Sequence, residues 1–402
     1  MKDSKLNTDR LKVGANGFLG LFSIVGISLY GLPFFYDFWV QDFGWSRVTV
    51  TSGNAFGKIT VGFFAFFAGW IIDKIGPKKV MIAGIMAGGL ALVGLSQVNS
   101  LWQFYAFYLL SAVGYMCGGP LPNQVLISRW FSTSRGKAMG IAYIGIGAGG
   151  MLVPQIAKSL ILHFDWHFAM MILGFLMIII SLPMTILVKD NPETTDSVTP
   201  IQKEKIPLKS VLKGWPFYLL LIGSMCSIGA VSGTNQNLKL YFSLDLKYAQ
   251  TTSANIISIV LASSILGRLF MGWLADKMNK KYVMILIYSI VAGSIVILYN
   301  ANSIGMVYFF AFVFGIGLGG DYMIIPLMAA ELFGVKMLGR IMGIILTFDG
   351  IAEAFSPMLV GWIRDKYSDY SLGFLGLIIL GIIGTLAILF LPVKKKPQPE
   401  SE

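Results

Sequence analysis

Charged side chains are scarce in this sequence. Only 13% of its 402 residues are Asp, Glu, Lys or Arg, whereas 55% are hydrophobic. A soluble domain of this length carries about a quarter of its residues as charges, which cover its surface. The composition therefore excludes an ordinary soluble protein and favours a chain that lies largely in lipid.

Cysteine and histidine are almost absent. Cys117 and Cys226 both lie in apolar stretches, which excludes a disulfide framework. His163 and His167 stand at the ends of apolar runs, which excludes a histidine proton relay at mid-membrane. The sequence also lacks metal-ligand spacing, a phosphate-binding loop and a nucleophile motif. We therefore expect no enzyme activity, no cofactor and no metal.

Long apolar runs fill almost the whole chain. A helix that crosses a membrane needs about 20 mostly apolar residues. Such runs occupy residues 13–36, 48–72, 80–128, 138–157, 166–188, 214–238, 248–275, 282–330, 341–363 and 371–393. The runs 80–128 and 282–330 are each long enough for two helices. The sequence therefore predicts an all-α membrane protein with twelve transmembrane helices.

The net charge of +11 sits mostly in short loops between these runs. Lysine and arginine concentrate in the loops on one side, which is the bias that cytoplasmic loops carry. We therefore expect a lipid bilayer as the surroundings and no nucleic-acid partner. We expect a multi-pass protein of the cell (inner) membrane with both termini cytoplasmic. Segment 191–212 is predicted to be a cytoplasmic linker between halves 1–190 and 213–402, the second of which ends in a short basic cytoplasmic tail.

One short motif occurs twice. Gly69 and Asp73 at the end of the second predicted helix are matched by Gly272 and Asp276 at the end of the eighth, each 203 residues further on. Basic residues follow both copies. This repeat indicates a duplicated six-helix unit, and such repeats place a binding site between the halves near the middle of the membrane.

The first copy of the motif resembles the signature loop of the major facilitator superfamily. The resemblance implies the major facilitator fold, with two pseudo-symmetric six-helix bundles. It also implies a gating role for four residues, namely Gly69, Asp73, Gly272 and Asp276, because glycine permits close helix contact and the charges can latch the halves. The alternative is a solvated loop. The second copy departs from the pattern, since Asn279 replaces Gly76.

Three further runs are similar to the oxalate/formate antiporter and monocarboxylate porter branches of that superfamily. They are DFGWSR at 42–47, SRWF at 128–131 and GIGLGG at 315–320. The resemblance implies a small organic anion as the substrate. It also implies that Arg268 grips the substrate carboxylate, for which a guanidinium offers two parallel donors. A structural ion pair with an acid on a neighbouring helix is the alternative.

Other polar side chains inside the predicted helices are candidate site residues. Tyr30, Asn123 and Tyr322 are the hydrogen-bonding candidates, each equally compatible with helix packing. Ionisable residues inside a membrane are costly and mark function. They are Lys58, for which we favour an ion pair, Asp321 in the tenth helix, and Asp349 with Glu353, which lie one turn apart in the eleventh.

The signs of these charges constrain the substrate. Lys58 and Arg268 give +2, and the three acids give −3, so a bound monoanion needs a compensating positive charge. One solution is proton symport of a monocarboxylate such as lactate, pyruvate or formate, with one of the acids as the proton carrier. Another is a zwitterionic substrate such as an amino acid or betaine, and anion exchange of the oxalate/formate type is a third possibility.

Overall fold

The computed structural model describes residues 2–190 and 208–392. The first half contains α1 (Lys2–Val25), η1 (Gly26–Gly31), η2 (Leu32–Phe35), α2 (Tyr36–Phe43), α3 (Arg47–Ile75), α4 (Pro77–Leu95), α5 (Leu101–Gly118), α6 (Pro120–Trp130), α7 (Arg135–His163) and α8 (Trp166–Leu187). The second half contains α9 (Leu208–Lys213), α10 (Trp215–Leu240), η3 (Tyr241–Asp245), α11 (Gln250–Lys277), α12 (Lys280–Tyr299), α13 (Ile304–Phe333), η4 (Val335–Met337), α14 (Leu338–Tyr367) and α15 (Ser371–Leu389).

The prediction of twelve membrane-spanning helices is confirmed. Within the described residues, twelve helical segments are long and apolar enough to cross a membrane. The first of them runs over Asn7–Phe43, further than the predicted 13–36, because a π-helical and a 3-10 turn carry the chain from α1 into α2 without a break. The fourth is interrupted at Gly119, where α5 ends and Pro120 starts α6.

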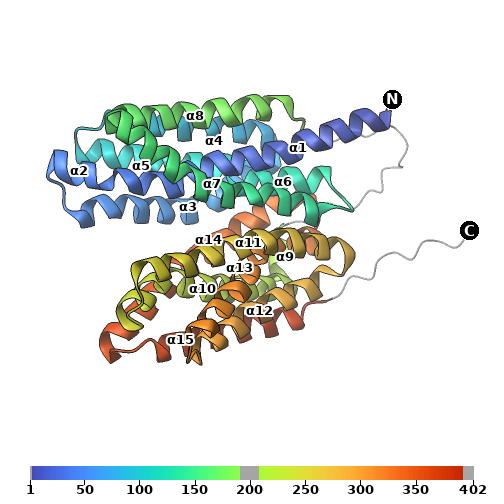
Figure 1. Ribbon diagram of the computed structural model, residues 1–402. Helices are drawn as coiled ribbons and strands as arrows, with labels where there is room; N and C mark the ends of the chain where they lie inside the picture. Colours follow the sequence, from blue (N-terminus) through green and yellow to red (C-terminus); the bar gives the residue numbers. More distant parts are fainter. Residues whose placement is uncertain (1, 191–207, 393–402) are drawn as a thin grey trace, which may run out of the picture.

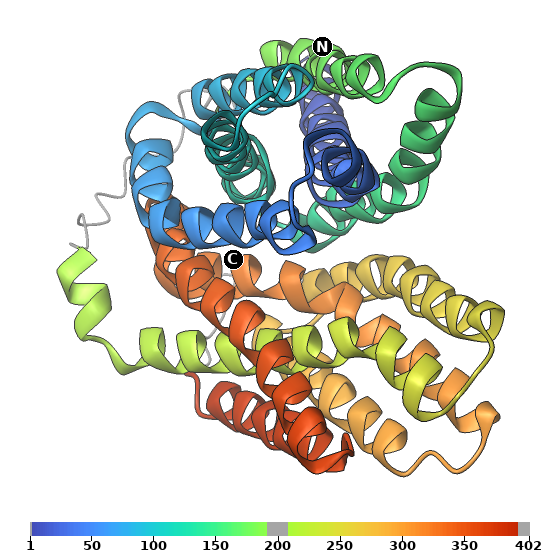
Figure 2. The same ribbon diagram turned by 90° about the vertical axis from the view of Figure 1, so that its left-hand side faces the viewer.

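The two halves lie side by side as separate bundles (Figure 1). They meet along two pseudo-equivalent seams, α3 against α14 and α7 against α11. Figure 2 shows the same two bundles turned by 90°, with helices of the first half seen roughly end-on. Of the predicted linker 191–212, residues 191–207 lie outside the described part of the chain, and residues 208–212 belong to the short helix α9.

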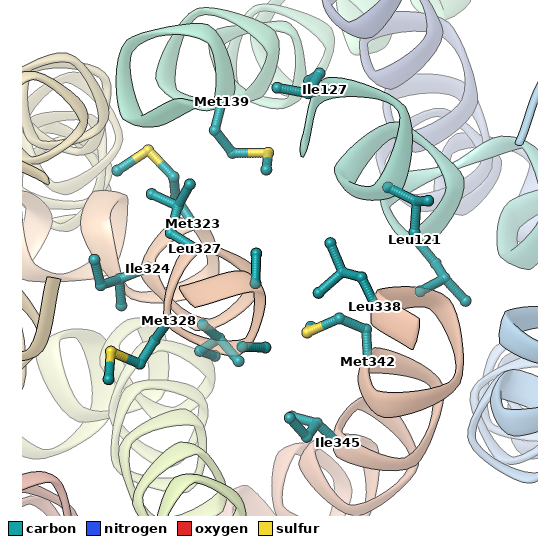
Figure 3. Close-up of a cluster of buried hydrophobic side chains, with 14 of the residues drawn as sticks. Leu121, Ile127, Met139, Met323, Ile324, Leu327, Met328, Leu338, Met342 and Ile345 are labelled. Carbon is teal, nitrogen blue, oxygen red and sulfur yellow. The ribbon is translucent and has the colours of Figure 1, made fainter. Parts of the chain in front are cut away.

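We call one end of the molecule the basic end, because lysine or arginine lies in or next to the turns that join α3 to α4, α6 to α7, α11 to α12 and α13 to α14. At this end one hydrophobic core contains side chains of both halves, among them Met139, Met323, Leu338 and Met342 (Figure 3). Toward the opposite end the buried side chains form two further cores, each within a single half. Among the described residues, the halves therefore share a core only toward the basic end.

Candidate functional site

Asp73 holds the start of α14 from across the first seam. Its Oδ1 accepts the backbone N–H of Gly339 at 3.1 Å, and its Oδ2 accepts the backbone N–H and the Nε–H of Arg340 at 3.0 and 3.1 Å. The first backbone N–H groups of a helix have no partner within the helix and carry partial positive charge. The carboxylate of Asp73, in the first half, thus accepts hydrogen bonds from three donors of the second half.

Asp276 makes the equivalent contact across the second seam. Its two carboxylate oxygens accept the backbone N–H groups of Gly136 and Lys137 at the start of α7, at 2.7 and 2.8 Å. The two copies of the sequence motif therefore form two pseudo-symmetric contacts that close the basic end. The turns that follow them differ, because Gly76 has a positive φ of 91°, whereas Asn279 at φ −65° caps α12 by accepting Lys281 N–H at 2.9 Å.

The glycines of the motif lie where the helices cross. A methyl group at Gly69 would collide with the carbonyl of Gly339 on α14, and one at Gly272 would collide with the carbonyl of Gly136 on α7. Only glycine, which has no side chain, lets these backbones touch. Gly69 and Gly272 therefore allow the halves to come into contact, and Asp73 and Asp276, four residues later, bind the facing helices.

Arg268 lies on α11 at the second seam, between the two halves. Its Nη1 atom is buried and has no hydrogen-bond partner, and a Cβ built on Gly147 of α7 would lie 2.9 Å from it. No acidic side chain of the described residues pairs with this guanidinium, whereas Lys58, Lys280, Arg340 and Arg364 each form an ion pair with an acid. Arg268 is half-buried, and a charged side chain within a membrane-spanning helix is costly without an opposite charge. Its guanidinium therefore remains available to an anionic ligand.

Tyrosines of the first half surround this guanidinium. The hydroxyls of Tyr30 and Tyr143 lie within electrostatic range of Arg268. Tyr143 also accepts a hydrogen bond from the amide of Gln124, whereas Tyr30 packs its ring near Gly150 of α7. Within the described residues the hydroxyl of Tyr30 has no hydrogen-bond partner, so it is available to a ligand beside Arg268.

Lys58 and Glu353 form an ion pair across the first seam. The Nζ of Lys58 on α3 lies 3.5 Å from Oε1 of Glu353 on α14, and the two side chains are 37% and 34% exposed. The hydroxyl of Tyr322 donates to the other oxygen of Glu353 at 3.3 Å. Tyr115 lies between the Lys58–Glu353 pair and the tyrosines near Arg268. It is within electrostatic range of Glu353, Tyr30 and Tyr143.

Asp321 and Asp349 lie deeper inside the second half and have hydrogen-bond partners of their own. Their side chains are 0% and 3% exposed and are hydrogen-bonded by serines of α10. Asp349 and Glu353 are one turn apart on α14, as their spacing predicts. They nevertheless have different partners, because α14 lies between α3 and α10 and each carboxylate turns to a different neighbour.

Asn123 is fully occupied within the first half. Its amide nitrogen donates to the carbonyls of Gly118 and Gly119, and its oxygen accepts from Asn16. These bonds satisfy the carbonyls freed where α5 breaks before Pro120. The geometry gives Asn123 a role in the helix break, and the substrate contact predicted for it stays a prediction.

Sequence reasoning missed three polar residues of these groups, namely Tyr143, Ser224 and Ser227. The serines offered one signal, since a spacing of three places both on one face of α10. The described residues contain no group of three or more His, Cys, Asp or Glu side chains that could hold a metal ion.

The chain matches the family model of the Major Facilitator Superfamily over residues 17–298 and 220–402. It therefore belongs to this superfamily and is a secondary transporter rather than an enzyme. The predicted membership and fold are confirmed.

Among curated proteins, the chain is similar to the uncharacterized MFS-type transporter YcxA of Bacillus subtilis (strain 168). The two are 27% identical over 328 residues, which cover 78% of each protein. Monocarboxylate transporter 12 of Rattus norvegicus is 26% identical over 331 residues, 73% of this chain and 68% of that protein. The membrane sensor protein UhpC of Salmonella typhimurium is 25% identical over 373 residues, 85% of this chain and 82% of UhpC.

Solved structures show the same fold. A variant of the E. coli fucose:proton symporter FucP superimposes with a TM-score of 0.77 at 13% identity, over 96% of this chain and 98% of FucP. FucP in an outward conformation superimposes with a TM-score of 0.76 at 14% identity, over 96% of this chain and 99% of FucP.

Proposed function

We propose that this transporter carries a small monocarboxylate together with a proton across the cell membrane, and that Arg268 binds the carboxylate. The single observation that carries the proposal is the guanidinium of Arg268, which lies between the halves with no acidic partner in the described chain. Its fork of donors matches two carboxylate oxygens. The similarity to monocarboxylate transporter 12 supports the same substrate class.

The positions of the charges favour a monoanion over a zwitterion. Near the interface, Lys58 and Glu353 compensate each other, so Arg268 leaves a local charge of +1. A monocarboxylate neutralises that charge. The ammonium group of a zwitterion would need an acid beside the carboxylate site, and Glu353 is already paired with Lys58.

The same positions favour proton coupling. Asp321 and Asp349 lie in a separate region of the second half, where they can take up positive charge without touching the substrate. Tyr30 and Tyr322 complete the proposed substrate site, since both hydroxyls lie beside the charged groups at the interface.

The two aspartate contacts at the basic end suggest how the cycle is gated. We assign the basic end to the cytoplasm, because lysine and arginine concentrate in cytoplasmic loops. With this orientation, the contacts of Asp73 and Asp276 close the cytoplasmic side of the transporter. Release of these contacts opens the substrate site to the cytoplasm in an alternating-access cycle.

The proposal is tested by counterflow in proteoliposomes that contain the purified protein. Vesicles loaded with unlabelled lactate, pyruvate, formate, oxalate or glycine betaine are supplied with labelled compound, with and without a pH gradient. We expect counterflow with a monocarboxylate and accumulation when the outside is more acidic. Counterflow with glycine betaine alone would contradict the substrate class. Oxalate–formate exchange that ignores the pH gradient would instead identify an anion exchanger.

A further inference from the structure

Two acids from different helices are enclosed by hydroxyl groups inside the second half. Asp321 of α13 accepts a hydrogen bond from Ser227 at 2.8 Å, and both oxygens of Asp349 of α14 lie 2.6 Å from Oγ of Ser224. Both serines belong to α10 and are buried, at 0% and 1% exposed. Three helices thus converge on one polar group within a hydrophobic bundle.

A third polar side chain lies near this group, and its hydroxyl has no hydrogen-bond partner in the described chain. The hydroxyl of Tyr288 on α12 is buried without a hydrogen-bond partner, and it lies within electrostatic range of both Asp321 and Asp349. Oδ2 of Asp321 is also buried and unpartnered. A buried polar group without a hydrogen-bond partner is costly. Two such groups beside the same acids indicate that this cluster holds something besides its own side chains.

The cluster contains negative charge that no basic side chain of the described residues balances. The charged groups that act on Asp349 are Asp321 and Glu353, both acids. Two neighbouring carboxylates in a low dielectric cannot both stay ionised, so the cluster requires a positive charge from outside the side chains present.

The other titratable groups on the surrounding helices do not supply that charge. Tyr322 of α13 faces both acids, Cys226 of α10 faces Tyr288, and α15 carries no ionisable residue. The cations of the surrounding helices have other partners or neighbours. These are Lys58 with Glu353, Arg268 beside Gly147, Lys277 over the ring of Trp273, Lys280 with Glu331, Lys281 with the carbonyl of Leu391, Arg340 with Asp73, Arg364 with Asp245 and Lys366 over the ring of Trp362. Lys239 follows Ser227 by twelve residues, about 18 Å along α10.

We propose that Asp321 and Asp349 together bind the coupling proton, in a site separate from the substrate. This inference rests on the proton coupling proposed above and identifies where the proton is held. A proton fits better than a metal cation, because the serine hydroxyls already donate to the carboxylates. Only Oδ2 of Asp321 and the hydroxyl of Tyr288 remain open, whereas a hard metal cation needs about six oxygen ligands.

The site is placed where its charge can affect gating. Asp349 follows Arg340 by nine residues, so it lies about 13 Å along α14 from the contact with Asp73. Asp321 is on α13, whose Met323 and Leu327 belong to the core shared by both halves at the basic end. The proposed proton site therefore lies between α10, α13 and α14, and the last two of these helices extend into the closed basic end.

Infrared spectroscopy of the purified protein tests the site without any substrate. A protonated carboxyl group has a C=O stretch that a carboxylate lacks and that shifts in D2O. We expect this band at neutral pH in the unmodified protein and its decrease in both Asp321→Asn and Asp349→Asn. Ser294→Ala is the matched control, because Ser294 is a buried serine of α12 that bonds only its own helix. Glu353→Gln should also retain the band, because its partner is Lys58.

Three results would overturn the proposal. They are the absence of the band at neutral pH, an unchanged band in both Asn variants, and loss of the band when sodium is added at constant pH, which would identify a sodium site. Tyr288→Phe keeps the result interpretable if an Asn variant does not fold, since it should shift the band while leaving both acids in place. A failure of the substrate assignment would appear only in counterflow, because the infrared measurement contains no substrate.

Discussion

The carboxylate of Asp73 on α3 accepts a hydrogen bond from Nε of Arg340 on α14 at 3.1 Å, although the two residues belong to different halves of the molecule. The same carboxylate accepts the first free backbone donors of α14, so it binds both a side chain and a helix end. In the alternating-access cycle proposed above, this contact must break whenever the basic end opens. We therefore expect its strength to affect how fast the transporter cycles.

We expect Asp73→Asn to slow transport about tenfold or more while substrate affinity changes little. Asparagine keeps one acceptor but loses the charge, and a hydrogen bond to a charged group contributes about 1.5–3 kcal/mol. Initial uptake rates and equilibrium binding are measured on the same preparation. Asp276→Asn at the equivalent position should behave alike, and an equal loss of rate and affinity would argue for misfolding or a binding role.

Gly69→Ala should lower the thermal unfolding temperature, because the added methyl group meets the carbonyl of Gly339 and forces α14 away. Overpacking of this kind costs about 1–3 kcal/mol. Gly293→Ala is the matched control, since a Cβ there has nothing within 4 Å and alanine favours a helix by up to about 1 kcal/mol. Equal unfolding temperatures for the two variants would contradict the close helix contact.

The ion pair of Lys58 and Glu353 should contribute little to stability. Both side chains are about one third exposed, at 37% and 34%, and such pairs are worth about 1 kcal/mol or less. A double-mutant cycle with Lys58→Met and Glu353→Gln, read by thermal unfolding, measures the coupling. A coupling of several kcal/mol would show that the pair is buried in the working protein.

Asp321→Asn and Asp349→Asn should each abolish accumulation driven by a pH gradient while exchange of substrate continues. A permanently neutral side chain resembles the protonated acid, so binding and crossing survive but the proton no longer follows. Accumulation and exchange are assayed on each variant, with Glu353→Gln alongside. Normal accumulation in both aspartate variants would exclude proton coupling through these acids.

The sequence predicts the architecture well, because a membrane requires about 20 apolar residues for each helix and the charged loops separate them. The repeated motif also locates Asp73 and Asp276. What they bind is not predictable from side chains, since the donors are backbone N–H groups at the starts of α14 and α7.

The positions of the buried acids are harder to predict for a different reason. Helix α13 is apolar on all sides, so its sequence has no polar face that would orient Asp321 toward the interface or into the bundle. For Asp349 and Glu353, helical spacing predicts their proximity but not their separate partners on α10 and α3. Asn123 shows the same difficulty, because its role depends on where α5 breaks.

The measurement that tests the central claim most directly is counterflow of a labelled monocarboxylate by Arg268→Lys in proteoliposomes, at equal amounts of folded protein. Lysine keeps the positive charge but offers no planar fork, and the loss of a charged hydrogen bond lowers binding by about tenfold or more. We predict counterflow at least about tenfold below that of the unmodified protein, with an unchanged unfolding temperature. Counterflow close to the unmodified level would contradict the account, because Arg268 would then be a structural residue and the carboxylate would bind elsewhere.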